Sequence, residues 1–93
     1  MDCSSIKYSD HAVLQMFKRD ISTQMVETIL ETGEIIKSYP EDKPYPSFLI
    51  LGFTNEKPIH LVVAKNSKTL DCVIVTAYIP DLGLWEEDFK EKK

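Results

Sequence analysis

The chain has 93 residues, of which 43% are hydrophobic and 28% charged, with three glycines and five prolines. This length fits a single domain spanning residues 1–93 with one core, and this composition excludes disordered and fibrous chains. The 15 acidic residues outnumber the 11 lysines and arginines, and the resulting formal charge of −4 argues against nonspecific coating of DNA.

The sequence shows no sign of export, membrane insertion or metal binding. It has no leader segment with a basic and an apolar part, and no apolar run long enough to cross a bilayer, so we expect a cytoplasmic protein without a membrane partner. Cys3 and Cys72 lie far apart and outside any Cys/His ligand spacing, which predicts neither a disulfide framework nor a zinc site. No cofactor is expected, and Cys72 is predicted to be a small buried hydrophobe.

A first amphipathic helix is predicted to begin at Ser9 or Asp10, either of which can cap it. Apolar residues at helical spacing form one stripe that we expect to face the core, made of Ala12, Val13, Met16 and Phe17. The outward side carries His11, Gln15, Lys18 and Arg19. Basic and titratable side chains thus gather on an exposed helix surface, as they would in a site.

A second amphipathic helix is predicted to follow almost at once. Ser22 or Thr23 can cap it, and Gly33 ends it. Its apolar stripe consists of Met25, Val26, Ile29 and Leu30. The short connection between the two helices predicts an antiparallel helical hairpin, which needs another surface to bury its apolar stripes.

Four antiparallel strands are predicted to supply that surface. Runs rich in β-branched and aromatic residues, separated by turn signals, cover residues 34–39, 47–53, 59–65 and 69–79. A short extra strand at Ile6–Tyr8 is left open. Pro80 ends the last strand, and the spacing of Trp85 and Phe89 predicts one helical turn in the C-terminal tail.

The last two strands are predicted to form a hairpin with two different faces. One face carries Ile59, Leu61 and Val63 beside Val73, Val75 and Ala77, and is expected to take the helices. The other face then carries His60, Val62 and Ala64 with Cys72, Ile74, Thr76 and Tyr78. This second face becomes polar toward its far end, as a sheet does where it lines a cleft.

Two separated patterns carry a family resemblance. They are H-A-x-x-x-M-x-x-R-x-I-S at His11–Ser22, and T-x-Y-x-P-D from Thr76 followed by W-x-x-D-F-K from Trp85. With these patterns the chain resembles, over about residues 6–92, a family of small uncharacterised prokaryotic domains of unknown function in the RelE/ParE-like toxin superfamily. The resemblance implies an α+β fold with an N-terminal helical hairpin packed on one face of a curved four-stranded antiparallel sheet.

The same resemblance implies a toxin-like domain of a toxin-antitoxin system. Relatives in the superfamily include ribonucleases that inhibit translation, gyrase inhibitors and inactive members, so the fold alone selects no activity. The partners implied are an antitoxin protein encoded nearby and RNA or the ribosome, and a homodimer is left open.

Metal-independent RNA cleavage requires a base, an acid and cations for the charged phosphorane. The candidate catalytic residues are His11, Arg19, His60 and Tyr78. The histidines would act as base and acid, Arg19 would hold a phosphate, and Tyr78 would donate a hydrogen bond or stack on a base. The candidate substrate-binding residues are Lys18, Lys65 and Thr76.

Most candidates also have a structural interpretation, and Thr76 and Tyr78 fit ordinary sheet residues. His11 fits a first-turn residue bonded to a loop, Arg19 favours the helix dipole and could pair with Asp20 or Glu34, and His60 fits a satisfied sheet histidine. A single arginine and a negative net charge also fit a second function. That function is a non-catalytic protein-binding module, which would use an exposed sheet edge or the loop at residues 39–47.

Overall fold

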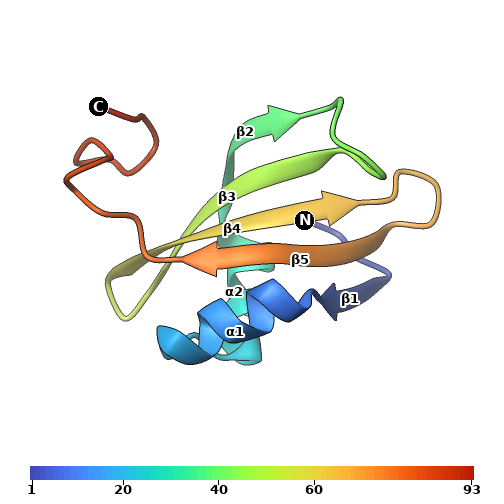
Figure 1. Ribbon diagram of the computed structural model, residues 1–93, viewed down its shortest axis with the longest axis horizontal. Helices are drawn as coiled ribbons and strands as arrows, with labels where there is room; N and C mark the ends of the chain where they lie inside the picture. Colours follow the sequence, from blue (N-terminus) through green and yellow to red (C-terminus); the bar gives the residue numbers. More distant parts are fainter.

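The computed structural model describes residues 1–93 as one layer of two helices against a five-stranded mixed sheet (Figure 1). The elements in chain order are β1 (Ser5–Tyr8), α1 (Asp10–Lys18), α2 (Thr23–Thr32), β2 (Glu34–Tyr39), β3 (Ser47–Thr54), β4 (Lys57–Lys65) and β5 (Asp71–Tyr78). The strand order is β1-β5-β4-β3-β2, with β1 parallel to β5 and every other pair antiparallel. The α+β class is confirmed, whereas the four-stranded antiparallel sheet is corrected by the fifth, parallel strand.

The two helices begin where their predicted caps stand. The Ser9 hydroxyl accepts a hydrogen bond from the Ala12 N–H at 3.0 Å, and the Ser22 hydroxyl accepts one from the Met25 N–H at 3.1 Å. Gly33 ends α2 with its N–H bonded to the Ile29 carbonyl at 2.7 Å. Its φ of −74° needs no glycine, but a Cβ there would lie 2.6 Å from that carbonyl oxygen. Close packing therefore explains this glycine.

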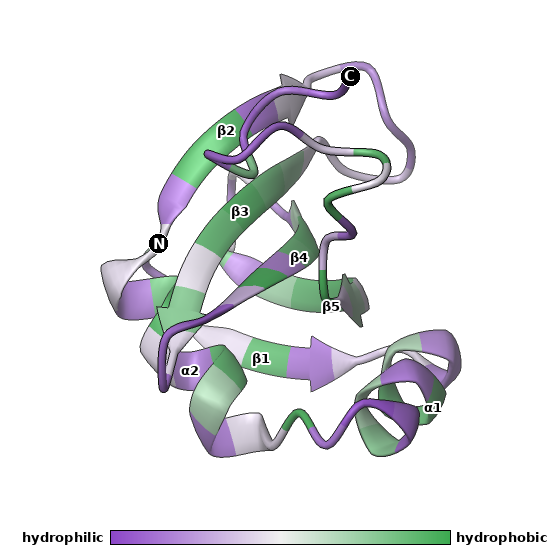
Figure 2. Ribbon diagram, turned by 90° about the vertical axis from the view of Figure 1, so that its left-hand side faces the viewer, coloured by the Kyte–Doolittle hydropathy of each residue, from purple (hydrophilic) through white to green (hydrophobic).

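The helices do not pair with each other as the predicted hairpin. Instead α1 lies against β5 and α2 lies against β3, on the same side of the sheet (Figure 2). The core fills the space between helices and sheet, and its largest buried side chains are Val26, Ile29, Ile50, Ile59, Leu61, Val63 and Ile74. No helix is long and apolar enough to cross a membrane.

The register between β4 and β5 confirms half of the predicted pattern and corrects the other half. Ile59, Leu61 and Val63 do face the helices. A β-bulge at Val62/Val63 shifts the pairing, so that Leu61 lies opposite Ala77 but Val63 lies opposite Ile74. Cys72 and Ile74 consequently belong to the core, whereas Val73 and Val75 move to the opposite side, which we call the open face.

The open face is the side of the sheet that carries no helix. It consists of side chains that alternate with those of the core along each strand. Its main residues are Leu49, Leu51, His60, Val62, Val73, Thr76 and Tyr78. Leu49, Leu51 and His60 are nevertheless buried, and Trp85 and Phe89 contact His60 from outside the sheet.

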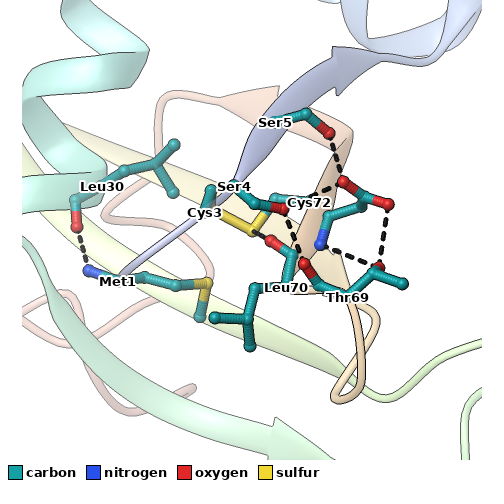
Figure 3. Close-up of a disulfide and its surroundings, with 9 residues drawn as sticks. Met1, Cys3, Ser4, Ser5, Leu30, Thr69, Leu70 and Cys72 are labelled. Carbon is teal, nitrogen blue, oxygen red and sulfur yellow. Dashed lines mark hydrogen bonds between the residues drawn. A yellow bond between two sulfur atoms is a disulfide. The ribbon is translucent and has the colours of Figure 1, made fainter.

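The N-terminal segment contains the disulfide Cys3–Cys72, which overturns the prediction of two unlinked cysteines (Figure 3). The two residues are 69 positions apart, but the parallel pairing of β1 with β5 sets Ser5 beside Asp71 and Ile6 beside Cys72. The Cα atoms of Cys3 and Cys72 are then 5.5 Å apart, within bonding range for a disulfide. Cys72 is buried as predicted, but as half of a crosslink.

Polar contacts hold the same segment (Figure 3). The Ser5 hydroxyl donates to the Asp71 carboxylate at 2.6 Å, and the single Ser4 hydroxyl proton is shared between that carboxylate at 3.0 Å and the Thr69 carbonyl at 2.7 Å. The hydrogen bond from Ser5, followed by those from Thr69 and Ser4, lowers the pKa of Asp71. The amino group of Met1 donates to the Leu30 carbonyl at the end of α2.

Candidate functional site

The structure does not bring the two predicted catalytic histidines together. His11 is exposed on α1, in the helix layer. His60 lies on β4 between residues that face the helices, so its side chain points to the open face on the other side of the sheet. A sheet therefore separates the proposed base from the proposed acid.

The predicted cations are also separated from one another and from His60. Lys18 and Arg19 are exposed at the end of α1, where the Arg19 side chain donates to the Gln15 side chain. Arg19 pairs with neither Asp20 nor Glu34, since the salt bridge of Glu34 is made by Lys90 at 3.1 Å. Lys65 lies at the opposite end of β4 from His60.

The structure does bring His60 and Tyr78 together. The His60 Nδ1 and the Tyr78 hydroxyl are 3.1 Å apart, because these residues are partners across β4 and β5. Their rings meet edge to face at 5.2 Å, and the half-buried Thr76 lies on the same face two residues before Tyr78. Two of the four candidate catalytic residues and one candidate substrate-binding residue therefore share the open face.

His60 is fully enclosed, with 0% of its surface exposed. Its Nε2 lies 2.7 Å from the Phe89 carbonyl, which can only accept, so Nε2 carries the proton. Nδ1 is then an acceptor and Tyr78 donates to it. The ring of Trp85, itself 4% exposed, meets His60 edge to face at 4.5 Å. Both ring nitrogens are engaged, which fits the structural interpretation of this histidine.

Burial lowers the pKa of His60, and the hydrogen bond to the Phe89 carbonyl only partly opposes this effect. The His60 ring is therefore neutral in the folded chain. Burial, with the nearby Tyr39 as a smaller cause, raises the pKa of Tyr78, which keeps that hydroxyl a hydrogen-bond donor.

We expect acid to weaken the fold through His60. Its pKa is lower in the folded chain than the unfolded value of 6.5, so the unfolded chain binds more protons as the pH falls through 6.5. The free energy of unfolding should be highest above pH 6.5 and fall below it, by at most about 1.4 kcal/mol per pH unit. Urea unfolding at about pH 7.5 and about pH 5.5 measures this. The His60→Gln variant should lose less stability than the wild type between these two pH values. Equal losses would contradict the lowered pKa of His60.

The C-terminal tail, residues 80–93, covers His60 without forming the predicted helical turn. Phe89 adopts a φ of 58°, and the tail folds back so that Trp85 pairs with Lys92. The Phe89 ring contacts Phe53 edge to face at 6.5 Å, and Lys92 lies over the Trp85 ring at 5.7 Å. Packing on the open face has replaced the local helical contact.

A hollow of about 250 Å³ lies on another part of the open face. Its lining from the sheet is apolar, and its wall is part of the loop that sequence reasoning named as a candidate partner site. The residues that form it include Pro44, Tyr45, Val62, Ala64, Val73 and Val75. Within this loop the Ser47 hydroxyl donates to the Asp42 carboxylate, which fixes the wall against the sheet.

The surface of α1 departs most from the prediction. Ala12 and Met16 face the core, but Val13, Leu14 and Phe17 are 54%, 52% and 84% exposed. Val13 and Phe17 were predicted to be buried, and Leu14 was not singled out. The apolar positions between residues 12 and 17 cover an arc of about 200° at 3.6 residues per turn, which is wider than one packed face. That excess width was the available signal for an exposed apolar surface.

The fold defined here is a small α+β domain with helices on one face of its sheet. The family model described as Domain of unknown function (DUF4258) matches residues 8–79, and the chain belongs to this family. Searches of curated proteins and of solved structures found no match. The matched part contains Cys72, His60 and Tyr78, while Cys3 and the whole tail lie outside it.

Proposed function

We propose that this chain is a RelE/ParE-like, toxin-type domain that acts by binding a partner protein, in the manner of a toxin held by an antitoxin encoded nearby. The observation that carries this proposal is the exposed apolar surface of α1, formed by Val13, Leu14 and Phe17. Residues three and four apart lie on one side of a helix, so Phe17 extends both Val13 and Leu14 into a continuous patch. Exposed apolar patches of this kind are typical of protein interaction sites.

Catalysis receives less support than binding from the arrangement of the candidate residues. His11 and His60 lie on opposite sides of the sheet, and both nitrogens of His60 are engaged. Arg19, the chain's single arginine, contacts Gln15. A site for RNA cleavage needs its base, its acid and its cations within reach of one phosphate.

The expected partner offers an amphipathic polypeptide segment. An apolar helix surface of three side chains is complemented by the apolar stripe of another helix, read at i, i+3 and i+4. The net charge of −4 favours a partner with a positive overall charge, because complementary charge speeds association. The exposed Lys18 and Arg19 beside Phe17 favour acidic residues where the segment meets α1.

Replacing Phe17 is expected to break the complex while leaving the domain folded. The chain would be co-expressed with the protein encoded beside its gene, and complex formation measured by size-exclusion chromatography and calorimetry. Phe17→Ala should weaken binding by about tenfold or more, since large aromatic anchors dominate interfaces. Its stability should stay within about 0.5 kcal/mol, because the side chain is 84% exposed. Ile35→Ala, which removes an exposed apolar residue from β2 at the other end of the sheet, is the matched control.

Three outcomes would contradict this proposal. The first is the absence of a complex, or a complex that Phe17→Ala leaves intact. The second is a dimer of the chain alone that Phe17→Ala dissociates, which would make the α1 surface a contact between copies. The third is growth arrest with RNA cleavage on expression of the chain, abolished in folded His11→Ala, Arg19→Ala and His60→Ala variants.

A further inference from the structure

The tail is attached to the sheet through side chains and one carbonyl, without strand pairing. Every backbone–backbone hydrogen bond of residues 80–93 joins two residues of the tail, and none reaches a strand. Figure 1 shows this segment as an irregular chain beyond the end of β5. Segments held by few contacts open at low free-energy cost, while the sheet beneath stays folded.

The contacts that do attach the tail come from a short stretch. Trp85 places its ring against His60, and the Phe89 carbonyl accepts the His60 Nε2–H. The Phe89 ring lies against Phe53, and Lys90 pairs with Glu34 at 3.1 Å. The sheet thus receives an aromatic side chain, a backbone carbonyl and a second aromatic side chain. These are elements that any polypeptide segment of suitable sequence can present.

The family match covers the receiving surface and stops before the tail. The family match ends at residue 79, so it includes His60, Phe53 and Tyr78 but none of the tail. With the tail absent, the Nε2–H of His60 would lose the acceptor that satisfies it. A donor held in place by Tyr78 and set among apolar side chains gains stability from an incoming carbonyl.

We propose that the open face around Phe53, His60 and Tyr78 is a peptide-binding site, which the tail occupies within its own chain. The partner that fits it is a polypeptide segment with two aromatic side chains four residues apart, bound through the first ring and the carbonyl of the second aromatic residue. This segment must displace the tail. A tethered tail acts at an effective concentration of about millimolar, so the site is largely closed to weaker competitors.

This site lies on the face of the sheet opposite α1, so it does not depend on the function proposed for the α1 surface. The probe for it is a fluorescein-labelled peptide of residues 80–93, added to the full-length chain, with binding measured by fluorescence anisotropy. In the Trp85→Ala chain the tethered tail loses its main anchor and the site becomes free. This variant should bind the peptide about tenfold or more tightly than the wild type does.

Three controls make the result specific. A peptide with Ala in place of Trp85 should not bind. The Leu82→Ala chain, changed at an exposed tail residue, should bind like the wild type. The Lys90→Glu substitution replaces the exposed ion pair with Glu34 by two acidic residues that repel each other. It should increase peptide binding by roughly twofold to fivefold without affecting folding.

Equal binding of the peptide by wild type and Trp85→Ala would overturn the proposal, as would no binding by folded Trp85→Ala. If Trp85→Ala fails to fold, the Lys90→Glu chain decides, and its failure to bind more peptide than wild type overturns the proposal. Neither result bears on the partner expected at α1, which is measured with a different variant and a different ligand.

Discussion

Reduction of the Cys3–Cys72 disulfide is expected to lower the free energy of unfolding by about 4 kcal/mol. The crosslink joins residues 69 positions apart, so it closes nearly three-quarters of the chain into one loop in the unfolded state. In the chain-entropy model, a loop of this size loses conformational entropy worth about 4 kcal/mol at 25 °C. Marginal stability is typical of a domain this small, so this is a large share of the total.

Urea unfolding with and without a dithiol reductant measures the effect. Cys3→Ser is the appropriate variant, because Cys3 is only half-buried while Cys72 lies in the core. The variant should be as unstable as the reduced wild type and insensitive to the reductant. Thiol labelling of the unfolded wild type should find no free thiol before reduction and both thiols after it. Two labelled thiols before reduction, or a variant as stable as the oxidised wild type, would contradict the assignment.

The disulfide shows where sequence reasoning lacked information. The sequence predicts both helix starts, the core residues of β4 and the existence of the strands, because caps and periodicity are local signals. The position of Cys3 beside Cys72 depends on a parallel pairing between the first and last strands, a contact no local pattern encodes. Separation along the chain was therefore a poor argument against a crosslink.

The predicted register of β5 was wrong for a related reason. Strict alternation along the strand predicts Val73 and Val75 for the core, yet one extra residue at a β-bulge moves Ile74 there instead. Beyond a bulge, each residue of the strand points to the face opposite to the one that strict alternation predicts. The two alternatives differ in which β5 residues contact the helix layer. Because this is a tertiary contact, the sequence alone could not distinguish them.

The candidate site was predictable in part. Placing His60 and Tyr78 on one face follows from strand alternation, and the structure has them in contact. Their separation from His11 follows from which side of the sheet takes the helices. The contacts that Trp85 and Phe89 make with β4 and β3 were not predicted, because the spacing of the two residues also fits a helical turn.

Replacing Ile29 by alanine is expected to cost about 2 to 5 kcal/mol of unfolding free energy. Ile29 is fully buried where α2 crosses β3, and its removal leaves a cavity lined by core side chains. Gly52 on β3 lies directly under it. A Cβ added at Gly52 would come within 2.6 Å of the Ile29 Cγ1 and Cγ2 atoms, so Gly52→Ala alone should cost about 1 to 3 kcal/mol through overpacking.

The two substitutions should compensate each other. In the double variant, the methyl group of Ala at position 52 enters space that the Ile29 side chain has vacated, so the clash disappears and the cavity shrinks. The loss in unfolding free energy should then be smaller than the sum of the single losses by about 1 kcal/mol or more. Gly83→Ala is the matched control for a glycine-to-alanine change without a core clash, because the added Cβ meets only the Asp81 side chain, at 3.3 Å, in the exposed tail. Strict additivity of the two core substitutions would show that α2 does not approach β3 at this point.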